Sequence, residues 1–229
     1  MSGKTLLWDF DGTLATRPRR WGGAMIEALD RHVPDHGFVP ADLRPHLRTG
    51  FPWHEPERPH PELDDPAAWW ERLENVMRRA YEALGLGTSV SPTLARTARS
   101  RYVDPESFEL YDDALPALNA LRTAGWRHVV LSNHVPELES IVRGVGLHDL
   151  FDHVITSARI GFDKPHPEAY AIARRLAGDP EQIWMIGDNP VADVHGAEAV
   201  GIPAILVRSP RTDVARRADD LHGAQRFLQ

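Results

Sequence analysis

The sequence contains no cysteine, which excludes disulfide bonds and metal sites built from thiolates. Lysine is almost as scarce, because 24 of the 26 basic residues are arginine and lysine occurs only at Lys4 and Lys164. No segment approaches the roughly 18 consecutive apolar residues that read as a membrane span. The N-terminal apolar run is also too short for a signal peptide, since Asp9 interrupts it. We therefore expect a cytoplasmic protein with no membrane partner.

Positive charge is in deficit as well. The chain has 26 basic and 33 acidic residues, a net charge of -7. This balance disfavours non-specific binding to nucleic acids, but it leaves room for a small anionic ligand in a locally positive pocket. None of the 12 histidines belongs to an HExxH motif, the signature of a helical zinc site, so we interpret the histidines, including His54 and His60, as surface or loop residues.

Five short apolar runs predict β-strands, and several of them are apolar almost throughout, as in parallel strands buried on both faces. They span residues 5–10, 127–133, 153–157, 183–188 and 202–207. Helical patterns cover residues 112–125, 136–146, 166–178 and 189–201, and the C-terminal tail suggests a short edge strand and a final helix. This alternation predicts an α/β fold with a doubly wound, Rossmann-like parallel sheet.

The gap after the first strand is too long for a simple crossover. It holds roughly 100 residues, whereas a parallel crossover needs only a dozen or so. Apolar residues at three- and four-residue spacing predict helices over 20–33, 65–85 and 91–103, and the Pro-rich residues 51–63 predict an extended loop. We therefore assign residues 1–15 and 109–229 to an α/β core domain and residues 16–108 to an inserted α-helical cap domain.

Polar side chains follow four of the predicted strands. Asp9 and Asp11 end the first, Ser132 and Asn133 end the second, Lys164 follows the third, and Asp188 and Asp193 follow the fourth. Ligands of open α/β sheets bind at the carboxyl ends of the strands, where the strand order reverses. If the first and fourth strands are neighbours there, four carboxylates, a hydroxyl and a lysine converge.

These segments resemble a known set of motifs. DFDGTL, LSN, the lysine of KPHP and GDNPVAD are similar, in this order, to the four motifs of the haloacid dehalogenase-like (HAD) hydrolase superfamily. The resemblance covers residues 1–15 and about 110–210. The insertion lies where the helical cap of the subclass I members belongs, as in phosphatases of the phosphoglycolate phosphatase type.

The resemblance implies a Mg²⁺-dependent phosphatase that hydrolyses a small phosphorylated metabolite, a phosphate ester, through an aspartyl phosphate. Asp9 would be the nucleophile and Asp11 the general acid and base, with Ser132 and Lys164 completing the catalytic set. The metal would be held by Asp9, the backbone carbonyl of Asp11 and Asp188, with Asp193 as a further ligand or an orienting group. The phosphate group would be bound by Gly12, Thr13, Ser132, Asn133 and Lys164.

Elementary electrostatics supports a cation at this place. A carboxylate that attacks a phosphate group meets a repulsion of roughly 4 kcal/mol per pair of unit charges at about 4 Å and an effective dielectric constant near 20. A Mg²⁺ ion that binds both partners removes this repulsion.

Asp11 favours a phosphatase, since family members that cleave carbon–halogen bonds lack this second aspartate. A phosphomutase of the same superfamily would share all core residues, and a catalytically silent binding module would share the fold. The substrate stays open, as does the choice between monomer and homodimer. Contacts to an anionic substrate from Arg17, Arg19, Arg20 or the 51–63 loop stay open too.

Overall fold

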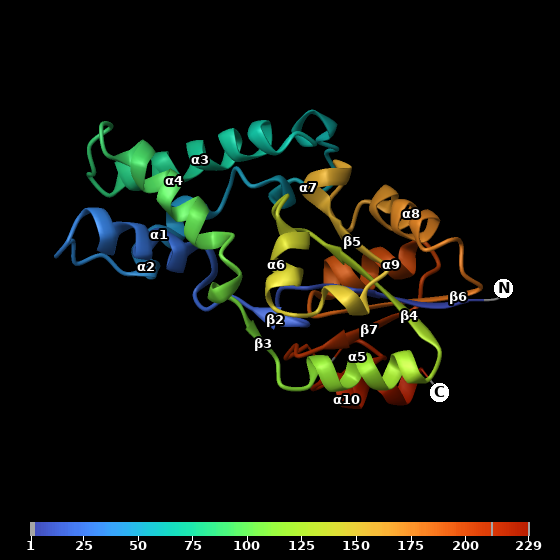
Figure 1. Ribbon diagram of the computed structural model, residues 1–229. Coiled ribbons are helices and arrows are strands. Elements are labelled where there is room, and N and C mark those ends of the chain that lie inside the picture. Colours follow the sequence, from blue (N-terminus) through green and yellow to red (C-terminus); the bar gives the residue numbers. More distant parts are fainter. Residues whose placement is uncertain (1–2, 212, 229) are drawn as a thin grey trace.

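The computed structural model describes residues 3–211 and 213–228, and within them the main sheet has six strands in the order β5-β4-β1-β6-β7-β8 (Figure 1). Neighbouring strands of this sheet are parallel. The strands are β1 (Lys4–Trp8), β4 (Trp126–Ser132), β5 (His153–Thr156), β6 (Gln182–Gly187), β7 (Ala204–Val207) and β8 (Arg217–Ala218). The order reverses at β1, which confirms the predicted doubly wound α/β fold.

Both faces of the sheet are covered by helices, which explains the unbroken apolar character of β1. Leu6 and Trp8 pack into one hydrophobic cluster and Leu7 into the other, because successive side chains of a strand point to opposite faces. The first cluster includes α5 (Ala114–Thr123), α6 (Leu138–Gly144) and α10 (Leu221–Ala224), and the second includes α8 (Pro167–Leu176) and α9 (Gly196–Ala199).

The inserted segment forms a separate group of helices beyond the carboxyl end of the strands (Figure 1). It contains α1 (Arg20–His32), α2 (Pro40–Leu43), α3 (Pro66–Ala83) and α4 (Ser91–Tyr102). Two short strands, β2 (Ala15–Thr16) and β3 (Glu109–Leu110), pair antiparallel where the chain enters and leaves this group. The helical cap is thus confirmed, while the domain boundaries at residues 15/16 and 108/109 remain a prediction.

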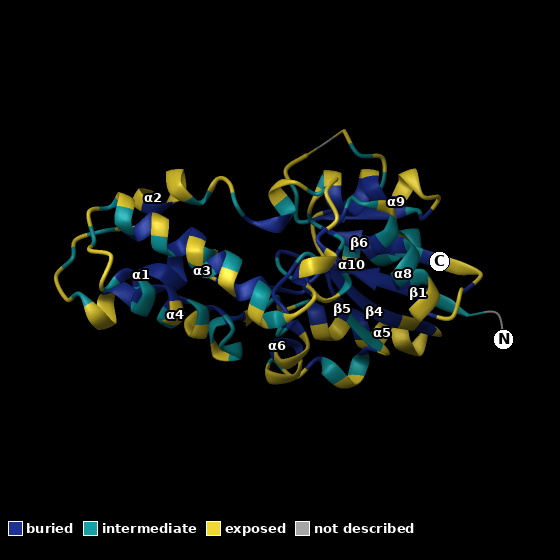
Figure 2. Cartoon of the chain, turned by 90° about the horizontal axis from the view of Figure 1, so that it is seen from above, coloured by how far each residue is buried: buried dark blue, intermediate teal, exposed yellow. Residues whose placement is uncertain are grey.

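The cap has an apolar centre of its own. In α3, Pro66 occupies the first turn and Asp65 caps the helix by accepting a hydrogen bond from the Ala68 amide at 3.3 Å. Trp69 and Trp70 of this helix are buried, and the Tyr81 hydroxyl donates to the Met25 carbonyl of α1 at 2.9 Å. Figure 2 shows that buried and exposed residues follow one another along α3. No helix of the described residues is long and apolar enough to cross a membrane.

Two expectations are wrong in detail. The Pro-rich residues 51–63 are not simply extended, because 3₁₀ turns form at Pro52–His54 and Pro61–Leu63, where proline in the first turn fixes a helical φ. The helix expected over 189–201 is a π-helical segment, Pro190–His195, followed by α9. Shorter elements that the sequence did not reveal are Arg44–Leu47, Pro105–Ser107, His148–Leu150, α7 (Ser157–Ile160) and Gln225–Phe227.

Candidate active site

The loop after β1 is shaped by a turn around one backbone carbonyl. The Phe10 carbonyl accepts hydrogen bonds from the amides of Thr13, Leu14 and Ala15 at 2.9–3.2 Å, and the Gly12 backbone has a φ of 98°. A Cβ atom at position 12 would lie 2.5 Å from a carboxylate oxygen of Asp188. Glycine is therefore required here both for the left-handed backbone and for the close approach of Asp188.

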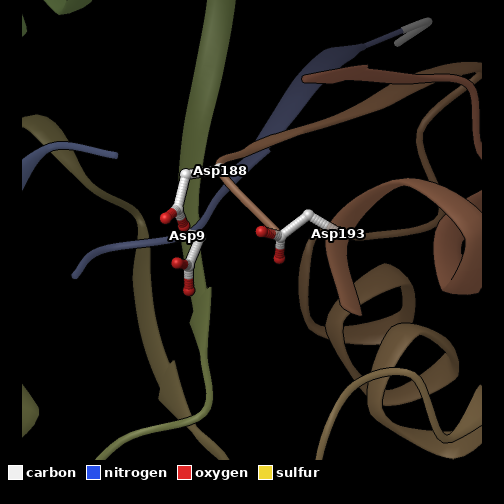
Figure 3. Close-up of side chains that lie close together, drawn as sticks. All are labelled: Asp9, Asp188 and Asp193. Carbon is white, nitrogen blue, oxygen red and sulfur yellow. The ribbon is translucent and has the colours of Figure 1, made fainter. Parts of the chain in front are cut away.

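Three carboxylates gather at the ends of the central strands. β1 pairs with β6 so that Trp8 lies opposite Ile186, which brings the following Asp9 close to Asp188. Asp193 comes from the π-helical segment, where its carboxylate accepts a hydrogen bond from the Asn189 amide at 2.9 Å. One oxygen from each of the three carboxylates lies within 4.8 Å of the others (Figure 3).

Lys164 and Ser132 bind the same oxygen of Asp9. The Ser132 hydroxyl donates to Asp9 Oδ1 at 2.7 Å, and Lys164 Nζ lies 3.0 Å from this oxygen and 2.5 Å from Asp193 Oδ1. Asn133 holds the lysine backbone on both sides, since its Oδ1 accepts from the Lys164 amide at 2.7 Å and its Nδ2 donates to the Lys164 carbonyl at 2.8 Å. These contacts fix the lysine beside the carboxylates.

The charges of the site perturb one another. Burial raises the pKa of Asp188 to about 7, and the negative charges of Asp9 and Asp193 act in the same direction. Burial also raises the pKa of Asp193 to about 6, although the Lys164 ammonium opposes this shift. For Lys164 burial lowers the pKa, but Asp193 and Asp9 outweigh it and the pKa is raised, so the lysine stays charged. The carboxylates therefore carry more negative charge than Lys164 balances.

This donor set fits a hard divalent cation. Carboxylate oxygens are the ligands that Mg²⁺ and Ca²⁺ prefer, and a cation among Asp9, Asp188 and Asp193 would offset the mutual repulsion that, together with burial, raises the pKa values of Asp188 and Asp193.

Asp11 stands beside this cluster. Burial raises the pKa of Asp11 to about 6, and the Arg20 guanidinium, whose Nε lies 3.7 Å from Asp11 Oδ2, opposes the shift. Among the described residues, Asp11 Oδ1 is buried and has no hydrogen-bond partner. A buried oxygen without a partner costs free energy, which points to a ligand or water in the functional state.

A cavity of about 310 Å³ opens over these side chains. Its core side includes Asp9, Asp11, Ser132, Asn133, Lys164, Asp188 and Asp193, all of them expected from the sequence. Gly12 supports the site by giving room to Asp188, whereas Thr13 is fully buried and Arg17 is buried in an ion pair with Glu27 at 3.2 Å. Thr13, Arg17 and Arg19 do not line this cavity.

The opposite wall includes Arg20 and two residues of the 51–63 loop, for which the sequence left contacts with a substrate open. Trp21, Trp53, Pro56 and Tyr102 come from the inserted segment, and the Trp21 and Tyr102 rings stack at 3.6 Å between centroids. Sequence patterns marked α1 and α4 as amphipathic but could not show that their aromatic residues face the carboxylates. His134 also lines the cavity. It directly follows Ser132 and Asn133, and this position in the sequence would have been enough to predict it as a site residue.

The interpretation of the histidines as surface or loop residues is wrong for His128, which is buried within β4. His60 and His134 lie in loops, as expected, but they are buried as well and at most 3% exposed. His60 comes from the Pro-rich segment and reaches the core, where its Nε2 lies 2.7 Å from Asp163 Oδ2 and its amide donates to the Gly161 carbonyl at 2.9 Å. Asp163 directly precedes Lys164. The cap sequence is thus joined to the lysine loop by a buried polar contact.

Known proteins of one family are similar to this chain. A family model described as haloacid dehalogenase-like hydrolase matches residues 4–201. The human haloacid dehalogenase-like hydrolase domain-containing protein 3 is 35% identical over 217 residues, which cover 91% of this chain and 83% of the human protein. Phosphoserine phosphatase of Thermus thermophilus is 32% identical over 240 residues, covering 95% of this chain and 94% of the relative.

Solved structures show the same fold. A 2-haloacid dehalogenase from Pseudomonas syringae superposes with a TM-score of 0.69 at 21% identity, over 99% of this chain and 98% of the other. A HAD phosphatase from Thermococcus onnurineus superposes with a TM-score of 0.66 at 21% identity, over 98% and 97% of the two chains. At this level of identity the two structures show the fold alone.

Proposed function

The chain belongs to the haloacid dehalogenase-like hydrolases, and from this we propose that it is a Mg²⁺-dependent phosphatase that hydrolyses a small phosphorylated metabolite through an aspartyl phosphate. The observation that carries the proposal is the convergence of Ser132 and Lys164 on Asp9, with Asp188 and Asp193 within reach of one shared cation. The Thermus relative, named as a phosphatase, supports the same reaction class.

Asp9, Asp188 and Asp193 are the side chains that would hold Mg²⁺, with the Asp11 carbonyl as a further ligand. The bound ion would neutralise the charge of the phosphate group and so reduce its repulsion by the attacking carboxylate.

In the first step, Asp9 attacks phosphorus and the bond to the ester oxygen breaks. Ser132 and Lys164 already surround Asp9, so they are placed to bind the phosphate oxygens as the new bond forms. Lys164 then stabilises the charge that develops on these oxygens.

Asp11 supplies the proton that the leaving oxygen needs. It lines the cavity beside Asp9. Its raised pKa of about 6 is close to neutral pH, as an efficient general acid requires. After the alcohol leaves, the Asp11 carboxylate removes a proton from the water that hydrolyses the aspartyl phosphate. This second displacement regenerates Asp9 and releases inorganic phosphate.

The Asp9→Asn variant tests the proposal. An amide is a poor nucleophile, so turnover of p-nitrophenyl phosphate with Mg²⁺ should fall by at least about 10³-fold. The matched control is Asp149→Asn, a change at an exposed aspartate outside the site, which should keep wild-type kcat. Undiminished turnover in Asp9→Asn would refute the mechanism, and a folded wild-type protein without turnover of any phosphate ester would favour a binding module instead.

A further inference from the structure

A second cavity, of about 560 Å³, lies where the chain passes from the catalytic loop into the cap. Five of its eleven lining residues are arginines: Arg17, Arg19, Arg20, Arg44 and Arg48. With 24 arginines in 229 residues, a random set of eleven would contain about one. None of the described residues that line the cavity is acidic, in a chain whose net charge is -7. The cavity therefore concentrates positive charge against the trend of the whole molecule.

Carboxylates compensate only part of this charge. Arg17 pairs with Glu27 at 3.2 Å, and Arg20 lies 3.7 Å from Asp11. Arg19, Arg44 and Arg48 are exposed, and none of them lies within 4 Å of a carboxylate in the described part of the chain. Guanidinium groups suit carboxylate and phosphate because their planar donors bind two oxygens at once. An anion in the cavity would offset the mutual repulsion of these arginines.

The backbone supports an anion at the same place. Helix α1, which has 13 residues, begins at Arg20, and its N-cap residue Arg19 provides no side-chain hydrogen bond to the first turn. The first three residues of the helix, Arg20, Trp21 and Gly22, line the cavity, so the positive end of the helix dipole lies there, although the Arg20 amide already donates to the Arg17 carbonyl at 3.0 Å. Helix α2, next to α1 in the cap (Figure 1), leads directly into the turn that carries Arg44 and Arg48.

The second cavity adjoins the catalytic cavity, because Arg20 and Trp21 line both. Arg19 and Arg20 have left-handed backbones, with φ values of 60° and 47°, a conformation that residues other than glycine seldom adopt. This pair of residues places Arg20 beside Asp11 while Arg19 borders only the second cavity. A molecule whose phosphate group is at Asp9 could reach the arginines with the far end of its leaving group.

We propose that the arginine-lined cavity is a subsite for a second anionic group, a carboxylate or phosphate, on the leaving group of the substrate. This inference rests on the proposed phosphatase function and narrows its substrate class to phosphate monoesters with a second negative charge. Arg44 and Arg48 are specificity-determining residues that touch the remote anion and not the reacting phosphoryl group.

Matched pairs of esters test the subsite. Phosphoglycolate and ethyl phosphate differ by one carboxylate, as do 3-phosphoglycerate and glycerol 3-phosphate. The wild type should have a KM about 10-fold lower or better for the anionic member of at least one pair. The double variant Arg44→Ala/Arg48→Ala should raise that KM by about 10- to 100-fold, the range expected for lost charge-assisted hydrogen bonds, and should leave p-nitrophenyl phosphate turnover within about twofold.

The matched control is Arg31→Ala/Arg96→Ala, which removes the same charge from exposed positions of the cap outside both cavities. It should leave every KM within about twofold of wild type. Equal KM values for both members of each pair in the wild type would overturn the proposal. So would a double variant that keeps the preference for the anionic esters.

Calorimetry tests binding to the subsite independently of turnover. Phosphoglycolate is titrated with Mg²⁺ into the Asp9→Asn protein and into the same protein with the Arg44→Ala/Arg48→Ala changes. If the subsite exists, the second protein should bind phosphoglycolate at least about 10-fold more weakly than the first. Equal affinities of the two proteins would overturn the proposal. Absence of turnover in the wild type would instead refute the proposed function, whatever the outcome of the titration.

Discussion

Lys164 contacts two of the clustered carboxylates at once, and its side chain is only 2% exposed. Because the chain uses arginine at 24 of 26 basic positions, a lysine here indicates that the position requires a smaller charged group than a guanidinium. A compact ammonium fits between Asp9 and Asp193, whereas a planar guanidinium needs more room and presents its donors in a fixed fork.

We therefore expect the conservative substitution Lys164→Arg to lower kcat for p-nitrophenyl phosphate by roughly 10²-fold, although the charge is kept. The reason is that a donor aimed at the reacting phosphoryl group is displaced. Lys4→Arg is a natural control, since Lys4 lies 5.0 Å from the Trp126 ring at the start of β1 and outside the site. Equal activity of the two variants would show that charge alone is needed at position 164.

At the same scale, the sequence identified the core side of the site, whereas on the cap side it left contacts from Arg20 and the 51–63 loop open. Asp9, Ser132 and Asp188 lie at the ends of apolar strands. The parallel sheet therefore brings them together, whatever the shape of the helices and loops around it. Trp53 and Tyr102 reach the cavity only through the packing of the cap against the core. No local pattern encodes such a contact.

Among the elements, the Pro-rich segment 51–63 departs most from its expected form. Composition predicted an extended loop, but the segment forms two 3₁₀ turns, Trp53 and Pro56 line the catalytic cavity and His60 is buried against the core. The segment is held by partners about 100 residues away, among them Asp163 and Gly161. Strands and long helices were predictable because their signals are periodic, whereas the position of this segment depends on contacts with residues far away in the sequence.

The His60→Ala variant should loosen this segment. Removal of one partner leaves the buried Asp163 side chain without its hydrogen-bond partner, a change that typically costs about 1–3 kcal/mol. Hydrogen exchange over residues 53–63 should accelerate and the thermal midpoint should fall. His54→Ala, at an exposed histidine of the same segment, should change neither. If the double variant His60→Ala/Asp163→Ala is no more stable than His60→Ala, the pair is not the link that we describe.

On the scale of the whole molecule, buried histidines couple folding to pH. The Trp8 indole donates to His128 Nδ1 at 3.0 Å, and His128 Nε2 lies 3.1 Å from the Leu118 carbonyl, so the neutral ring with a proton on Nε2 fits both partners. Burial lowers the pKa of His128 to about 4. Protonation would place two donors face to face between β1 and β4.

The stability of the fold should therefore respond to pH in a defined direction. Between pH 4 and the unfolded value near 6.5 the unfolded state binds the extra proton, so the free energy of unfolding rises with pH over this window. The full contribution of His128, up to about 3 kcal/mol, is present above pH 6.5 and is lost as the pH falls toward 4. Urea unfolding of wild type and His128→Gln across this range measures it, and parallel pH profiles of the two proteins would contradict the assignment.

The pairing of β2 with β3 has one more consequence. The two strands that carry the chain into and out of the cap are bonded to each other, and Ala15 of β2 also bridges to Asp11. The side chain that we propose as the acid therefore lies within four residues of the strand that leads into the cap. A displacement of the cap helices that moved β2 would be passed on to Asp11 through this bridge, so that cap position and proton transfer would be linked.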